Sequence, residues 1–373
     1  MDRSDSQKPD GDTMKKMFLL ACAGRGIQPS SPAQPVSETE LPIDTQFRLV
    51  KESGLWDFFD RIPTASELDD FIKASEKYEI PILSGSWTYQ LGKEEPLITE
   101  NLQRAKTVGS LYHNLMVWAR HADGHLVTDD EIVASYLDTY EQAEKLGITI
   151  TYEVHADMWS EDMRRINQVA QAVRRHGIPF NFCMDYSHCI LKMENEIEQA
   201  VCGIRHDAES IRRLDPFNDD SFCDDWLAQD MVHWTQVRPV APNGPPNWLA
   251  CESGPFEGMG YGRPGRSIQY PFRQPASGEW LDTAWHAHKL ACTKEVVRKV
   301  IDDYLANPGS ATRIMTIDNI NLSAYGLGWK YNMYEDSCAV ARYVRELYAE
   351  RAAIFEARQR SGSAAAFIDQ YRP

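Results

Sequence analysis

The sequence alternates eight short apolar segments with segments whose apolar residues recur at helical spacing. Windows such as DDEIVASYLDTYEQAEKLG are amphipathic, and several begin with Asp, Ser or Thr and end in Gly, as capped helices do. A strand followed by a helix, repeated along the chain, predicts a parallel sheet. The eight apolar segments, rich in β-branched and aromatic residues, are 16–24, 55–62, 80–89, 111–120, 148–156, 178–187, 231–240 and 313–322.

Eight such units predict a closed barrel rather than an open doubly wound sheet. No GxGxxG motif follows the first strand, so the dinucleotide-binding form of an open sheet lacks its fingerprint. We therefore expect an α/β protein with a single (β/α)₈ TIM barrel over residues 14–350. Residues 1–13 have no apolar periodicity and predict a disordered tail, and 351–373 predict a C-terminal helix or tail.

One long segment, residues 239–280, breaks the alternation. It is rich in Pro, Gly and aromatic residues and has no helical or strand period. Long loops inside a compact domain are usually functional, and this one follows the seventh strand, on the side where barrel enzymes carry their active sites. The sequence therefore predicts a lid or pocket wall at 239–280.

The N-terminal run and the cysteines indicate in which cellular compartment the protein is expected. The run MKKMFLLACAG, residues 14–24, could be a signal peptide with a lipid-modified Cys22, but its apolar part is short and a polar tail precedes it, which favours a first strand. None of the eight cysteines forms a CxxC pair, and no apolar run approaches the ~18 residues of a membrane span. We expect a cytoplasmic protein with reduced thiols and no membrane partner.

The formal net charge is −16, and the Lys and Arg residues are scattered rather than gathered in a stripe. This distribution disfavours an electrostatic grip on nucleic acid. We therefore expect no nucleic-acid partner.

Polar residues gather at the ends of the last four strands. The fifth strand, in TYEVHADMW, places Glu153 and His155 on one face, because residues two apart in a strand point the same way. Barrel enzymes draw their catalytic groups from the C-terminal ends of several strands, so we expect these side chains to meet. The others are Asp185 and His188 after strand six, Gln236 and Arg238 in strand seven and Asp318 in strand eight.

Carboxylates together with imidazole or amide donors form the kind of site that binds a divalent cation. Without a cation, converging carboxylates would repel and raise one another's pKa. We expect Mn²⁺, with Mg²⁺, Co²⁺ or Zn²⁺ as alternatives.

The layout of eight strands, with E-x-H ending strand five, D-x-S-H ending strand six and an acidic residue in strand eight, resembles the xylose isomerase-like superfamily of TIM barrels. That superfamily includes sugar isomerases and epimerases, dehydratases, C-glycoside deglycosidase subunits and apurinic endonucleases of family 2. The resemblance spans roughly residues 14–350. Its motifs are short, so it indicates the superfamily rather than a substrate.

The resemblance implies a set of metal ligands on four strands. Two positions depart from the family pattern: Gln236 stands where the family has His, and Asp318 where it usually has Glu. His233 is the alternative ligand from strand seven. The implied set is Glu153, Asp185, Gln236 and Asp318.

The resemblance also implies the activity: a divalent-metal-dependent isomerase or epimerase that moves a proton beside a carbonyl of a sugar or polyol. His155 and His188 are the candidate proton carriers, with Glu153 or Asp318 as the rival base. The expected substrate-binding residues are His188, Arg238, Trp87, Trp118 and Trp159.

Three alternatives stay open beside the isomerase. One is a metal-dependent lyase, either a dehydratase or a subunit that cleaves a C-glycoside or 3-keto-glycoside. Another is a metal-poor binding or partner subunit, which the Gln236 departure favours. A metallohydrolase acting on DNA is disfavoured by the acidic charge. The expected partner is a small sugar, polyol or glycoside, and a homo-oligomer or a hetero-complex remains open.

Overall fold

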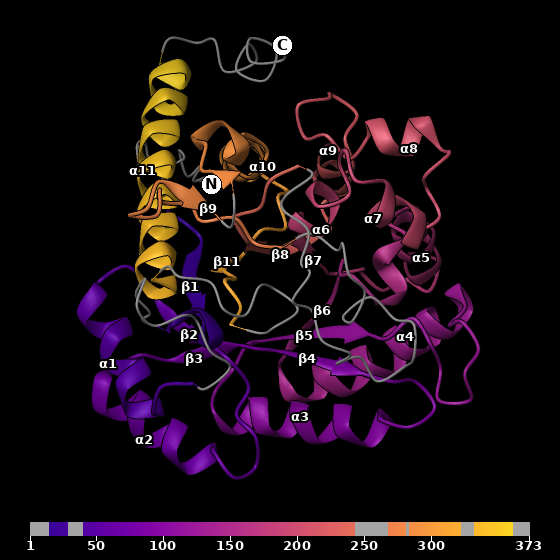
Figure 1. Ribbon diagram of the computed structural model, residues 1–373. Helices are drawn as coiled ribbons and strands as arrows, with labels where there is room; N and C mark the ends of the chain where they lie inside the picture. Colours follow the sequence, from indigo (N-terminus) through magenta and orange to yellow (C-terminus); the bar gives the residue numbers. More distant parts are fainter. Residues whose placement is uncertain (1–14, 29–39, 243–267, 281–282, 322–331, 361–373) are drawn as a thin grey trace, which may run out of the picture.

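The computed structural model describes residues 15–28, 40–242, 268–280, 283–321 and 332–360. Its main sheet has nine strands in the order β3-β2-β1-β11-β8-β7-β6-β5-β4, and the neighbouring strands run parallel (Figure 1). Each of the eight predicted segments contains part of this sheet. The strands are β1 (Leu19–Ala23), β2 (Phe58–Asp60), β3 (Ile82–Ser84), β4 (Ser86–Tyr89), β5 (Tyr112–Val117), β6 (Thr149–Glu153), β7 (Phe182–Asp185), β8 (Val232–Val237) and β11 (Ile314–Ile317).

The two ends of this strand order are consecutive in the chain, because only Gly85 separates β3 from β4. β3 pairs with β2 while β4 pairs with β5, so one bent strand joins the two edges and the sheet curls into a barrel. The α/β barrel predicted from the sequence is therefore confirmed. Gly85 lies against β2's end: a Cβ at this position would be 2.3 Å from the backbone nitrogen of Ile62.

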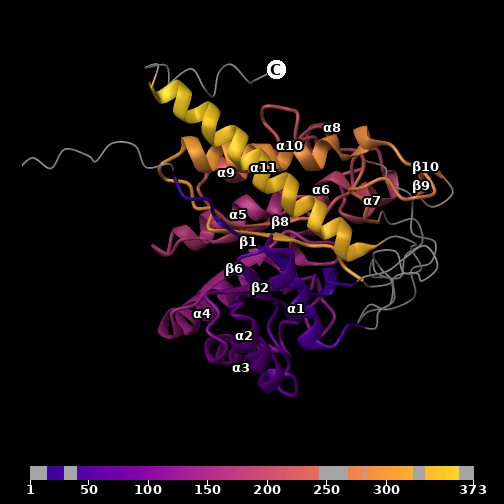
Figure 2. The same cartoon turned by 90° about the vertical axis from the view of Figure 1, so that its left-hand side faces the viewer.

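The helices lie outside the sheet. Figure 2 shows α10 and α11 on one side of the barrel and α2, α3 and α4 on the other. α4 illustrates how the sequence sets its ends: Thr128 and Glu131 form a capping box, and Gly147 closes the helix in a left-handed conformation. The helices are α1 (Ile43–Ser53), α2 (Leu68–Tyr78), α3 (Glu95–Thr107), α4 (Asp129–Leu146), α5 (Arg164–Arg174), α6 (Ser187–Ile190), α7 (Glu196–Val201), α8 (Ala208–Arg212), α9 (Phe222–Ala228), α10 (Ala291–Ala306) and α11 (Met333–Arg360).

The inside of the barrel is layered. One cluster of inward side chains is apolar and consists of Ala21, Phe58, Cys183, Trp234 and Ile314. Residues two positions further along a strand face the same way, and four of these are the polar, buried residues Asp60, Asp185, Gln236 and Thr316. Because the strands are parallel, the polar layer lies toward their C-terminal ends, which we call the mouth of the barrel.

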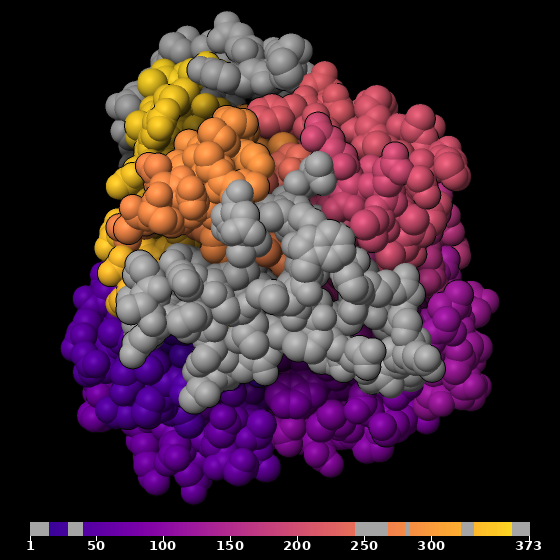
Figure 3. All heavy atoms as spheres, in the orientation of Figure 1, coloured from indigo at the N-terminus to yellow at the C-terminus, as the bar shows by residue number. Residues whose placement is uncertain are grey.

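The predicted lid at 239–280 is described only at 239–242 and 268–280, so its role as a lid stays a prediction. In the described part, β9 (Glu279–Trp280) pairs antiparallel with β10 (Thr283–Ala284). The segment packs on α11, where Asp336 accepts the backbone N–H groups of Phe272 and Arg273 at 3.0 and 2.9 Å. Figure 3 shows this orange surface against α11 in yellow.

The predicted tails fall largely outside the described residues. Residues 1–13 lie outside them, whereas α11 extends through 351–360, the first part of the predicted C-terminal segment, and 361–373 lie outside. Among the described helices, none is both long and apolar enough to cross a membrane.

The close approach at Gly85 predicts that Gly85→Ala destabilises the barrel. The added methyl group must displace the backbone of Ile62, and overpacking of this kind costs ~1–3 kcal/mol or more. Urea unfolding of the two proteins measures the difference. Gly54→Ala is the control, because a Cβ at residue 54 would have no atom within 4 Å. It should destabilise the protein only through the left-handed φ of 62°, by ~1–2 kcal/mol. Equal or smaller destabilisation by Gly85→Ala would contradict the packing argument.

Candidate active site

Four side chains predicted at strand ends come together at the mouth. Glu153 is the last residue of β6, Asp185 ends β7, Gln236 lies one residue before the end of β8 and Asp318 follows β11. All four are more than nine-tenths buried. Asp185 and Gln236 are paired on neighbouring strands, and the charges of Asp185 and Asp318 both act on Glu153. The mouth is therefore a buried, strongly acidic site.

Arg238, one residue beyond β8, connects two of these carboxylates. Its Nη2 donates to Asp318 Oδ2, its Nε donates to the backbone oxygen of Asp318 at 3.2 Å, and its Nη1 lies 3.1 Å from Asp185 Oδ2. Nη1 also donates to Ser187 Oγ at 3.3 Å. A guanidinium that is only 3% exposed thus joins the ends of β7, β8 and β11.

The two carboxylates next to Arg238 differ in their pKa. Burial acts to raise the pKa of Asp185, but the charge of Arg238 and the contact with His188 outweigh it and hold the pKa well below the ordinary value. Burial raises the pKa of Asp318 above its ordinary value, although Arg238 opposes the shift. Asp185 is therefore the firmly ionised partner of Arg238.

Glu153 lies apart from Arg238's hydrogen bonds. Its Oε2 accepts from Asn114 Nδ2, whose amide is held in turn by Thr151 Oγ1, a donor to Asn114 Oδ1 at 3.0 Å. Burial first, then the charges of Asp185 and Asp318, raise the pKa of Glu153 well above its ordinary value. Without a further cation, Glu153 therefore holds its proton to a higher pH than an ordinary carboxyl does.

One residue orients both histidines of the site. The backbone N–H of Ala156 donates to His188 Nδ1 at 3.2 Å, and His155 Nδ1 lies 2.6 Å from the backbone oxygen of Ala156. Burial lowers the pKa of both rings, so we treat both as neutral. The contact with the Ala156 oxygen then assigns the proton of His155 to Nδ1, whereas Nε2 of His188 lies 3.3 Å from Asp185 Oδ2 and 3.1 Å from the donor Nη1 of Arg238.

The loop that carries Ala156 is itself clamped. Asp157 has a left-handed φ of 66°, a conformation rare for residues other than glycine, and its backbone N–H donates to Glu161 Oε2 at 2.7 Å. Lys192, only 1% exposed, donates to Glu161 Oε1 at 3.0 Å. Lys192 follows α6, the helix of His188, so this ion pair connects the two segments that carry the histidines.

The donor set fits a cation. Glu153, His155 and His188 each offer a ligand atom, and these atoms lie within 4.8 Å of one another. Gln236 Oε1 is buried without a hydrogen-bond partner at the same mouth, which a cation would relieve. His188 fits less directly, because its Nδ1 accepts from the backbone N–H of Ala156 and its Nε2 lies against the guanidinium of Arg238.

The other predicted residues have different surroundings. Trp159 is 1% exposed and belongs to the main core, Trp87 in β4 is half-buried against the same core, and Trp118 is 9% exposed. His233 lies three residues before Gln236, near the start of β8, and its Nδ1 lies 3.3 Å from the backbone oxygen of Met231. It is thus Gln236 rather than His233 that strand β8 presents at the mouth.

Several site residues were missed in the sequence. Asp60 ends β2 inside the barrel, accepts from Ser84 Oγ at 2.6 Å, and burial raises its pKa to about 7. The rule of polar residues at strand ends, applied to FFD, would have found it. Asn114 and Lys192 could not be found by this rule, because Asn114 lies within a strand and Lys192 in a short helical segment. Neither position indicates a functional site in the sequence alone.

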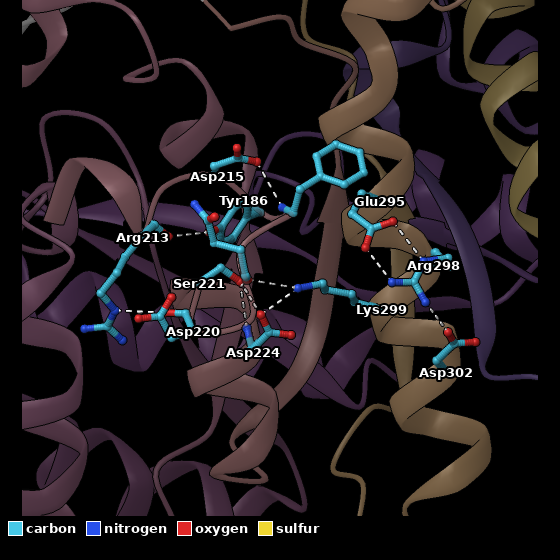
Figure 4. A network of polar contacts seen from close by, with 12 residues as sticks. Tyr186, Arg213, Asp215, Asp220, Ser221, Asp224, Glu295, Arg298, Lys299 and Asp302 are labelled. Atoms are coloured by element: carbon cyan, nitrogen blue, oxygen red, sulfur yellow. Dashed lines mark hydrogen bonds and ion pairs between the residues drawn. The ribbon is translucent and has the colours of Figure 1, made fainter. Parts of the chain in front are cut away.

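A hollow of about 580 Å³ is lined by residues of α9 and α10, and Figure 4 shows the polar contacts among some of them. Its cations already have acidic partners: Lys299 Nζ donates to Asp224 at 2.6 Å, and Arg298 Nε donates to Glu295 at 2.8 Å. This hollow therefore presents balanced ion pairs rather than a set of converging ligands.

The central position of Arg238 predicts that Arg238→Met destabilises the fold by ~3–5 kcal/mol at pH 7, since buried carboxylates lose their partner. The low pKa of Asp185 stabilises the folded wild type above the unfolded pKa of ~3.9, and this contribution is lost as pH falls below that value, so the difference should shrink below pH 4. Urea unfolding across pH measures this. Asp318→Asn in the same chain should recover part of the loss. Wild-type stability of the single variant would contradict the role given to Arg238.

The raised pKa of Glu153 predicts that the stability of the folded protein changes with pH in the direction opposite to that given by Asp185. When a group has a higher pKa in the folded state than in the unfolded state, the free energy of unfolding falls as pH rises from the unfolded pKa, ~4.3 for Glu, toward the folded one. Metal-free Glu153→Gln should therefore be more stable than the metal-free wild type at pH 8 and similar to it near pH 4. Glu76→Gln, on the exposed face of α2, is the control. Parallel pH profiles for Glu153→Gln and wild type would refute the assignment.

Comparison with known proteins gives neighbours among solved structures only. No family model matches the chain, and no curated protein matches its sequence. The IOLI protein with a bound zinc atom is 15% identical, with a TM-score of 0.46 over 90% of this chain and 99% of that one. A xylose isomerase-like TIM barrel protein from Mycobacterium smegmatis, in complex with magnesium, is 10% identical, with a TM-score of 0.49 over 89% and 98%.

A third neighbour is D-allulose 3-epimerase from Methylomonas sp., 11% identical, with a TM-score of 0.48 over 91% of this chain and 100% of that one. At such identities the likeness concerns the fold alone. The solved structures similar to this chain also include a xylose isomerase domain protein from Planctomyces limnophilus, 10% identical, with a TM-score of 0.46 over 90% of this chain and 99% of that one.

Proposed function

We propose that the chain is an enzyme that moves a proton beside a carbonyl of a sugar or related polyol, as an isomerase or epimerase with a divalent cation. The observation that carries the proposal is the buried group of Glu153, His155 and His188, whose ligand atoms lie within 4.8 Å of one another at the mouth of the barrel. Such a group is costly to bury and is the usual mark of a functional site.

The charge at the mouth supports a cation. Among the described residues, the carboxylates of Glu153, Asp185 and Asp318 lie in the field of the Arg238 guanidinium. With Glu153 ionised, two negative charges remain, and a divalent ion would balance them. The cation expected from the sequence is Mn²⁺, with Mg²⁺, Co²⁺ or Zn²⁺ as alternatives.

Glu153 and His155 are the residues that would hold the cation most directly. The Nδ1 proton of His155 faces the carbonyl of Ala156, which leaves its lone pair on Nε2. Gln236 would add a neutral oxygen, and Asp185 and Asp318 would share their charge between Arg238 and the cation. When bound, such a cation polarises a substrate carbonyl and acidifies the neighbouring C–H.

His188 is the proposed proton carrier. Its Nε2 lies 3.3 Å from Asp185 Oδ2 and 3.1 Å from Arg238 Nη1, and burial lowers the pKa of the ring, so it would readily return a proton that it takes from the substrate. Arg238 would steady negative charge that develops on a substrate oxygen. Glu153 and Asp318 remain the rival bases.

Two alternatives differ in their products. A lyase would use the same proton abstraction and then lose a leaving group, giving an unsaturated or cleaved product. A metal-poor binding subunit is favoured by one observation: Arg238 already supplies a cation to Asp185 and Asp318, where the resemblance implies metal ligands.

The decisive experiment is proton exchange in D₂O. We expect the protein loaded with Mg²⁺ or Zn²⁺ to exchange the hydrogen beside the carbonyl of at least one member of a panel of ketoses and 3-keto sugars, followed by ¹H NMR. Glu153→Gln should abolish metal binding at the mouth and reduce exchange at least ~10³-fold, whereas Glu76→Gln should match wild type.

Each result has one meaning. Exchange with an intact sugar skeleton supports an isomerase or epimerase, and an unsaturated product supports the lyase. A protein that binds no divalent ion by metal analysis and shows no rise in Tm on adding Mn²⁺ would overturn both enzymatic versions.

A further inference from the structure

A tight turn between β5 and α4 brings two histidines together at the rim of the mouth. The chain reads RHADGH over residues 120–125. The backbone N–H of His121 donates to the oxygen of His125 at 3.0 Å, and the N–H of Gly124, with a φ of 97°, donates to the oxygen of His121 at 2.9 Å. The two imidazole rings consequently stack with their centroids 4.7 Å apart.

The carboxylate of Asp123 lies between the two rings. Its Oδ1 is 3.2 Å from His121 Nδ1 and 2.5 Å from His125 Nδ1. In a tetrahedral zinc site, with bonds of ~2.0–2.2 Å, neighbouring ligand atoms lie roughly 3.3–3.5 Å apart. Of the two separations from Asp123, that to His121 is already close to this range and that to His125 must open by about 1 Å, which the exposed side chain of Asp123 permits. All three ligand atoms lie within 4.8 Å of one another.

The far side of each ring is also fixed. Nε2 of His125 lies 2.9 and 3.1 Å from the two carboxylate oxygens of Glu131, and Glu131 is itself held by the backbone N–H of Thr128 at 2.8 Å. A carboxylate behind a histidine assigns a proton to that side, as at many zinc sites, and a cation at Nδ1 would replace the proton that lies between Nδ1 and Asp123. Nε2 of His121 faces Gly92, where an added Cβ would be only 2.4 Å away.

We propose that residues 121–125 bind a transition-metal cation of the zinc class through Nδ1 of His121, a carboxylate oxygen of Asp123 and Nδ1 of His125. Two imidazoles and one carboxylate suit Zn²⁺, Ni²⁺ or Cu²⁺ better than Mg²⁺ or Ca²⁺, which prefer all-oxygen sites. Glu131 positions His125 from behind. Water would complete the coordination on the exposed side.

The site has a structural consequence for the barrel. The backbone N–H of Ala119, two residues before His121, donates to the oxygen of Asp157 at 3.1 Å, and Trp118 bridges to Met158. The turn is thus hydrogen-bonded to the loop that orients His155 and His188. A bound ion would stiffen this rim whether or not the mouth holds a catalytic cation.

Titration with Zn²⁺ in the Glu153→Gln background tests the proposal without interference from the mouth. We expect one Zn²⁺ per chain by isothermal titration calorimetry, and a rise in Tm on adding Zn²⁺. His121→Ala and His125→Ala should each lower the affinity at least 100-fold. Glu131→Gln should lower it roughly 10–100-fold, because it weakens the orientation of His125 while sparing the three ligands.

The other exposed histidine pair, His286 and His288, supplies the matched control, with ring centroids 5.3 Å apart. His286→Ala should leave the titration unchanged. Zn²⁺ binding that survives His121→Ala, or that is lost in His286→Ala instead, would overturn the proposal. Far-UV circular dichroism and unchanged urea unfolding of the metal-free variants would separate loss of ligands from loss of fold.

Discussion

The ion pairs of Arg238 with Asp185 and Asp318 are the interaction on which the mouth of the barrel depends. The guanidinium is 3% exposed and Asp185 is fully buried, so neither charge can be solvated by bulk water. A buried charge is tolerated only with a partner and hydrogen bonds, and this arrangement supplies both across three neighbouring strands. Every other polar group at the mouth is placed in the field of this cluster.

The barrel explains why these charges meet. Alternation along each strand places an apolar layer with Trp234 beneath a polar layer with Gln236, and the parallel direction of all strands brings the polar layer to one end. The bend at Gly85 closes the sheet, so strands distant in sequence face a common interior. Carboxylates separated by 165 residues, from Glu153 to Asp318, therefore act on one another.

Much of this could be predicted from the sequence. The eight strands could be predicted from the alternation of apolar segments with capped amphipathic helices. The rule that catalytic residues lie at strand ends identified Glu153, Asp185 and Asp318, whose roles stay proposals. The sequence could not give the pairing of Arg238 with two carboxylates, because a basic residue after a strand is as often solvated as buried. It also missed Ala156, which orients two imidazoles through its backbone and carries no side-chain signal at all.

The mouth divides into two electrostatic halves. Around Arg238, Asp185 keeps its charge because a permanent cation lies beside it, whereas Glu153 has only the amide of Asn114, and burial and the neighbouring charges favour its protonated form. A site built in this way can fold without a metal, since the guanidinium and the proton together limit the excess of negative charge. A divalent cation that binds at Glu153 must displace that proton, so its affinity should rise with pH while the pairing at Arg238 stays intact.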